Sequence, residues 1–172
     1  FLGRPRSQQR GAMFHDLRHD PDGTLRPGFV LNRPKYADAR ILVADRNFGC
    51  GSSRENAVTV MVDSGFRAFI APSFGDIFFN NCLQNGVLPI RLAADRVDAL
   101  RAALRATPGA SMTIDLAQQT VSGPDGRIDE FDIDGFRKDC LLRGVDEISL
   151  TLSYEAQIAA FEDRRRHEAP WL

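Results

Sequence analysis

The residues best suited to chemistry lie together in one short segment, residues 47–55, with the sequence Asn-Phe-Gly-Cys-Gly-Ser-Ser-Arg-Glu. Arg54 carries a planar guanidinium that can hold a carboxylate through two N–H groups. Ser52 and Ser53 offer hydroxyl groups for hydrogen bonding or proton transfer, and glycines let the backbone approach a bound group closely. The Lys-Ser/Thr ending of a phosphate-binding P-loop is absent, which argues against nucleotide hydrolysis. The segment therefore predicts a binding site for a carboxylate or a phosphate.

The same segment also fits a purely structural role. Ser52 and Glu55 have the spacing of a capping box, in which the serine accepts from a first-turn amide and the glutamate reaches back toward the serine. A cap alone explains neither Gly49 and Gly51 together nor a second hydroxyl and an arginine in one turn. Both interpretations remain open here, and the crowding of polar groups favours the functional one.

The flanking sequence indicates how this segment is positioned. Residues 41–44 form a short apolar run typical of a buried strand, and apolar residues at helical spacing follow from Ala57 to Val62, with Gly65 as the stop. The segment thus lies between the end of a strand and the start of a helix. α/β proteins commonly bind ligands at this connection between strand and helix. The free N–H groups and the positive dipole end at the start of the helix attract anions.

The remaining pattern predicts an α/β fold with parallel core strands. Further strands are expected at 69–71 and 87–90, and helices over 74–82, 97–104, 136–143 and 158–166. Residues 112–116 and 131–133 alternate apolar and polar side chains on either side of a turn at 123–126, which predicts additional antiparallel strands. Residues 1–34 are rich in turn formers and are expected to be largely loop.

Composition narrows the class of protein. The 172 residues, 43% of them hydrophobic, suffice for one domain with a sizeable core, and a formal charge of −1 gives no reason to expect nucleic acid or a membrane as partner. No apolar run approaches the ~18 residues that a membrane span needs. The dispersed cysteines Cys50, Cys82 and Cys140 match neither a metal site nor an even disulfide set, so we expect no metal on this chain and a cytoplasmic location.

Residues 47–55 resemble the signature of the 3-isopropylmalate dehydratase small-subunit family, and residues 70–81, 85–90 and 139–152 resemble further blocks of that family. The resemblance covers nearly the whole chain. It implies a single swivelling β/β/α domain over residues 1–172, like the C-terminal domain of aconitase. Phe1 and Leu2 resemble the end of the family's opening segment, so the family's first strand is expected to be missing here.

The resemblance implies a hydro-lyase that isomerises 2-isopropylmalate to 3-isopropylmalate by dehydration and rehydration, in leucine biosynthesis. Such a protein is active only with a large subunit, which holds a [4Fe–4S] cluster; the cluster is not bound by this chain. The substrate is a small hydroxy-dicarboxylate. By matching position, Ser52 would be the catalytic base and Arg54 would bind a substrate carboxylate, with Ser53, Gly51 and Cys50 also at the substrate.

Two features qualify this expectation. Asn56 stands where the family usually has a histidine, and Arg4, Arg6 and Arg10 resemble a flexible loop that helps set specificity, although a solvated loop also explains them. Two alternatives therefore stay open. The chain could serve a related dehydratase acting on homoaconitate or on a methylated malate or citrate, or it could be a non-catalytic, anion-binding paralogue.

Overall fold

A three-stranded parallel sheet forms the centre of the protein, whose computed structural model describes residues 13–169 and 171. Its strands β1 (Ile41–Val43), β2 (Ala68–Ala71) and β3 (Leu88–Arg91) lie in the order β1-β2-β3. Helices α2 (Asn56–Asp63) and α3 (Asp76–Gln84) make the crossovers that parallel neighbours require. The predicted parallel core and its helices are confirmed.

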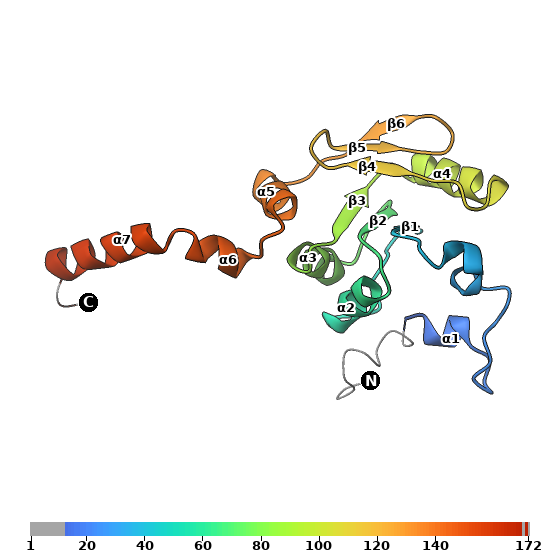
Figure 1. Cartoon of the computed structure of the whole chain (residues 1–172), viewed down its shortest axis with the longest axis horizontal. Helices are drawn as coiled ribbons and strands as arrows, with labels where there is room; N and C mark the ends of the chain where they lie inside the picture. Colours follow the sequence, from blue (N-terminus) through green and yellow to red (C-terminus); the bar gives the residue numbers. More distant parts are fainter. Residues whose placement is uncertain (1–12, 170, 172) are drawn as a thin grey trace.

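Alternate residues of β2 point into two separate hydrophobic clusters. Phe69 packs with residues of α2 and α3 on one face of the sheet, whereas Ile70 packs with residues of α4 (Ala94–Ala106) on the other. Both side chains have no exposed surface. Figure 1 shows α2 and α3 on one side of the sheet and α4 on the opposite side. The core therefore has two layers, and the helix α2 that follows residues 47–55 belongs to the first.

A second, antiparallel sheet packs near α4. Its strands β4 (Thr113–Asp115), β5 (Thr120–Ser122) and β6 (Ile128–Glu130) pair in sequence order. The expectation of antiparallel strands is confirmed, but the chain turns once more than predicted, at residues 116–119, where Gln119 has a φ of 57°. The expected strand at 131–133 is wrong, because pairing with β5 ends at Glu130.

The segment before the sheet is loop with short helical pieces. These are α1 (His15–Arg18) and the 3₁₀ turns η3 (Val30–Asn32) and η4 (Pro34–Tyr36), so the expectation of a largely irregular start holds for the described part. Strand β1 is half-buried rather than buried as predicted. β1 lies at one edge of the sheet, and β2 is its one partner among the described strands.

Three helices complete the chain: α5 (Gly135–Arg143), α6 (Glu147–Leu152) and α7 (Glu155–Glu168). Gly144, with a φ of 64°, ends α5 as a left-handed cap, so the predicted end of this helix at residue 143 is confirmed. The predicted helix at 158–166 is part of α7, which buries none of its residues and extends away from the sheets (Figure 1). Among the described residues, no helix has both the length and the apolar character needed to cross a membrane.

Candidate functional site

The predicted segment is a loop tied to the carboxyl ends of β1 and β2. The Phe48 N–H donates to the Ser73 carbonyl at 3.0 Å, and the Gly75 N–H donates to the Phe48 carbonyl at 2.9 Å, forming an isolated parallel bridge. Asn47, with a left-handed φ of 58°, donates its N–H to Ser73 Oγ at 2.8 Å. These bonds hold the loop across the end of the sheet, where α/β proteins bind ligands.

Tight packing explains one of the loop glycines. A Cβ added to Gly49 would lie 2.2 Å from the Phe78 ring, and the φ of 78° already disfavours a side chain. Gly51 differs, because a Cβ there would meet nothing within 4 Å. Gly49 is therefore needed for the loop to pack against Phe78 of α3. At Gly51, next to Ser52, the structure leaves open space.

The capping box is not formed. Helix α2 begins at Asn56, four residues after Ser52, and Glu55 in its N-cap position makes no side-chain cap. Ser52 Oγ instead accepts from the Arg54 N–H at 3.2 Å, within the loop. Glu55 Oε1 accepts from Asn85 Nδ2 at 3.1 Å, at the end of α3. The structural alternative for Ser52 and Glu55 is therefore wrong, because the helix starts too late for it.

The start of α2 retains capacity to bind an anion. The amides of Ala57 and Val58 already donate to the carbonyls of Arg54 and Glu55. Among the described residues, the N–H groups of Glu55 and Asn56 find no acceptor. Free amides at a helix start attract negative charge.

Ser52 and Arg54 border the same cavity, which has a volume of about 370 Å³. Asn56 lies at its edge with them, and both Arg54 and Asn56 are exposed while Ser52 is half-buried. Apolar residues line most of the remainder, among them Met13, Phe14, Ala57, Val60, Met61 and Phe78. A few polar groups at the mouth of an apolar cavity are typical of a small-molecule site.

The structure separates the other predicted site residues from this cavity. Cys50, Gly51 and Ser53 are exposed on the same loop but do not line it. The predicted specificity loop with Arg4, Arg6 and Arg10 lies outside the described residues. Sequence reasoning missed Met13 and Phe14, which come from an irregular segment whose pattern carries no signal for a cavity.

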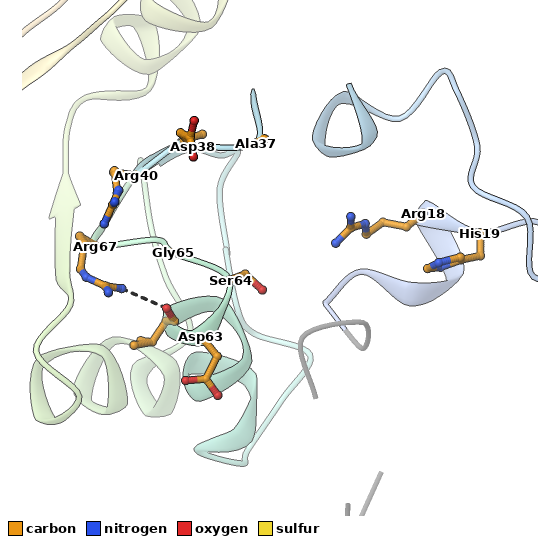
Figure 2. A pocket seen from close by; sticks show the side chains of 11 residues that line it. Arg18, His19, Ala37, Asp38, Arg40, Asp63, Ser64, Gly65 and Arg67 are labelled. Atoms are coloured by element: carbon orange, nitrogen blue, oxygen red, sulfur yellow. Dashed lines mark hydrogen bonds between the residues drawn. The ribbon is translucent and has the colours of Figure 1, made fainter. Parts of the chain in front are cut away.

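A larger cavity of about 710 Å³ lies at the opposite end of α2. Figure 2 shows Arg40 and Arg67 on one side of it, and Arg18 and His19 across from them. Two of these arginines are already engaged. Arg67 Nη1 donates to the carbonyls of Val62 and Phe66, and Arg18 Nε donates to Asn32 Oδ1 at 2.9 Å. This cavity is separate from the one at Ser52.

The cysteines occupy three unrelated places. Cys50 is exposed on the loop, Cys140 is half-buried on α5, and Cys82 is buried on α3, where desolvation raises the pKa of its thiol to about 12. Among the described residues, no group of three or more His, Cys, Asp or Glu side chains could hold a metal ion. The described cysteines therefore do not fit an iron–sulfur cluster, whose ligands must converge.

Three family models match successive parts of the chain. The aconitase C-terminal domain matches residues 8–95, and a model described as LeuD_N matches residues 98–135. The C-terminal domain of the 3-isopropylmalate dehydratase small subunit matches residues 147–172. The first of these matches spans the parallel sheet, α2 and the loop that carries Ser52.

Individual relatives agree with these matches. The chain is 52% identical over 160 residues to the 3-isopropylmalate dehydratase small subunit of Paramagnetospirillum magneticum, covering 93% of this chain and 80% of the relative. It is 55% identical over 148 residues to that of Neisseria meningitidis, covering 86% and 70%. The crystal structure of a 3-isopropylmalate dehydratase from Methanocaldococcus jannaschii matches with a TM-score of 0.52 and 26% identity, over 74% of this chain and 70% of that chain. This chain belongs to the family of 3-isopropylmalate dehydratase small subunits, hydro-lyases with an aconitase C-terminal-like fold.

Proposed function

We propose that this chain, together with a large subunit, isomerises 2-isopropylmalate to 3-isopropylmalate in the cytoplasm. Ser52 is the base in this proposal and Arg54 binds a substrate carboxylate. The observation that carries it is the shared cavity: a hydroxyl and a guanidinium border one apolar space beside free helix amides. A hydroxy-dicarboxylate with an alkyl group needs this combination of contacts.

Dehydration needs a proton to leave carbon and a hydroxide to leave the neighbouring carbon. Ser52 Oγ takes the proton, the released electron pair forms the carbon–carbon double bond, and Arg54 holds a carboxylate so that the reacting carbon faces the oxygen. Rehydration with the hydroxyl on the other carbon gives the isomer. An iron–sulfur cluster on the large subunit would supply the Lewis acid for the departing hydroxyl.

A serine hydroxyl is a very weak acid, so its alkoxide needs stabilisation. The Arg54 N–H already donates to Ser52 Oγ at 3.2 Å, and the start of α2 presents further amides and the positive end of its dipole. The exposed guanidinium of Arg54 adds positive charge nearby. These groups favour the alkoxide most strongly when water is excluded. The open, exposed rim fits a site that is closed by a second subunit.

Reconstitution tests this proposal. The chain would be mixed anaerobically with a cluster-bearing large subunit from a relative, and turnover would be measured with 2-isopropylmalate, homoaconitate, 2-methylmalate and a methylated citrate. We expect turnover of 2-isopropylmalate by the mixture and none by this chain alone. A complex that assembles and binds dicarboxylates without turning over any substrate would support the non-catalytic paralogue instead.

A further inference from the structure

We propose that the larger cavity, at the end of α2 opposite Ser52, binds the phosphate group of a small polar molecule. We call it the arginine cavity, after its lining residues Arg18, Arg40 and Arg67. Its volume of about 710 Å³ is typical of a small-molecule site. It shares no lining residue with the cavity at Ser52, so this inference is independent of the proposed function.

Two arginines lie next to each other on one wall of the arginine cavity. Arg40 and Arg67 come one residue before the first pair of the β1–β2 register, at the amino ends of both strands. The Arg67 N–H donates to the Arg40 carbonyl at 2.8 Å. Residues opposite each other on neighbouring strands project to the same face, and Figure 2 shows both side chains on one wall. Such a pair of like charges is unfavourable unless an anion neutralises it.

Both guanidinium groups keep donors for such an anion. The Arg40 side chain makes no hydrogen bond or ion pair with any described residue. Arg67 uses only Nη1, which donates to the carbonyls of Val62 and Phe66 at 3.0 and 2.7 Å. These two bonds fix the Arg67 side chain, while its Nε and Nη2 find no acceptor among the described residues. The pair therefore offers several free N–H groups at one place.

A third arginine stands across the cavity from this pair (Figure 2). Arg18 Nε donates to Asn32 Oδ1 at 2.9 Å, and Asn32 Nδ2 donates to the Arg18 carbonyl at 2.8 Å, so the side chain is held in place. Its two terminal nitrogens have no acceptor in the part of the chain that the structure describes. An anion in the cavity therefore has guanidinium groups on two sides.

The number of charges and oxygens favours phosphate over carboxylate. Arg40 and Arg67 together carry two positive charges, and each guanidinium can donate two parallel hydrogen bonds. A phosphate monoester carries a charge of about −1.5 to −2 near pH 7 and has three acceptor oxygens. A carboxylate has a single charge and two oxygens, so it matches only one arginine of the pair. A phosphate group can neutralise both.

The rest of the lining indicates what the phosphate is attached to. Asp38 and Asp63 also line the cavity, and neither forms an ion pair with its three arginines. With His19 neutral, three arginines and two aspartates leave a lining charge of +1. Carboxylates accept hydrogen bonds from hydroxyl groups. The arginine cavity therefore fits a phosphate ester that carries hydroxyl groups on its other end.

Calorimetric titration of the whole chain tests this inference, with ribose 5-phosphate as the probe and succinate as the carboxylate comparison. We expect one ribose 5-phosphate per chain with a Kd below ~1 mM, and at least ~10-fold weaker binding of succinate. Arg40→Gln should weaken ribose 5-phosphate binding at least ~10-fold, because a charge-assisted contact is lost. Arg105→Gln, at an exposed arginine of α4 that also lacks a described partner, is the matched control and should keep the parental Kd.

A second variant separates the two cavities. Arg54→Gln should bind ribose 5-phosphate like the parent, since Arg54 lines only the cavity at Ser52. Binding that is lost in Arg54→Gln but kept in Arg40→Gln would place the phosphate at Ser52 and overturn the inference. Succinate that binds as tightly as ribose 5-phosphate would contradict the preference for phosphate. Equal Kd values in the parent, Arg40→Gln and Arg105→Gln would mean an adventitious ion only.

These outcomes are distinguishable from a failure of the proposed function. The titrations need no large subunit and no turnover, so phosphate binding at Arg40 and isomerisation at Ser52 are measured separately. Thermal unfolding of each variant shows that it is folded before binding is compared. Arg40→Gln should unfold at the parental temperature, because the Arg40 side chain contacts no described partner that the substitution would leave unpaired.

Discussion

The role of the Arg54 side chain in substrate binding can be tested without disturbing the fold. Its guanidinium is exposed at the cavity mouth, and its backbone N–H, not its side chain, is bonded to Ser52 Oγ. We expect Arg54→Lys to keep the folded structure but to lower kcat/KM at least ~10-fold, because an ammonium cannot make a two-point contact with a carboxylate. Steady-state kinetics of the assembled enzyme measure this. Unchanged kcat and KM would show that Arg54 does not bind the substrate.

The elements that hold the site were predictable to different degrees. The runs at 41–44 and 69–71 and the helical spacing after Ala57 predicted the parallel core, because buried strands and amphipathic helices differ in period. The start of α2 was harder, since Ser52 and Glu55 match a capping box, yet Glu55 bonds to Asn85, 30 residues further along the chain. Only tertiary structure supplies that partner.

A cluster of ion pairs joins the buried Arg96 of α4 to the antiparallel sheet and gives a dependence on pH. Arg96 is 9% exposed, donates to both Asp125 and Asp129, and lowers the pKa of Asp125 to about 2 from an ordinary value of 3.8. The main cause is the hydrogen bonding from Arg96. Because the folded pKa is the lower one, this stabilisation is fully present above about pH 4 and is lost as pH falls toward 2.

Urea unfolding at several pH values checks this dependence. Asp125→Asn should be less stable than the parent at neutral pH, and the difference should shrink between pH 4 and pH 2 as the parent loses its ion pair. Because Asp129 shares the Arg96 guanidinium with Asp125, the difference reports on the ion-pair cluster that these three residues form. A stability difference that stays constant down to pH 2 would show that the Asp125 pKa is not lowered by folding.

Across the whole molecule, α7 stands apart from the two sheets. It buries no residue, and an isolated helix of this length is marginal in water. Deleting residues 155–172 should therefore change the free energy of unfolding by no more than ~0.5 kcal/mol, as for other exposed positions. Leu150→Ala is the contrasting variant, because Leu150 is 7% exposed and its truncation should cost ~2 kcal/mol or more. A deletion as costly as Leu150→Ala would mean that α7 packs on the body.

The cavity at Ser52 could be predicted only in part. Its loop and helix are consecutive in sequence, so the polar groups were found from their spacing. Met13 and Phe14 reach the cavity from an irregular segment almost 40 residues before Ser52, without periodicity to signal it. The apolar character of the cavity thus emerged only from tertiary packing.

The central claim is that Ser52 is the base, and Ser52→Ala tests it most directly. The hydroxyl accepts from the Arg54 N–H at 3.2 Å, donates weakly to the Arg54 carbonyl at 3.4 Å and forms no helix cap, so its loss should cost no more than ~1 kcal/mol of stability. In the complex with a cluster-bearing large subunit, kcat for 2-isopropylmalate should fall ~10³-fold or more, while assembly persists. Ser111→Ala, at an exposed serine between α4 and β4, should match the parent. A Ser52→Ala complex that turned over at close to the parental rate would contradict the account.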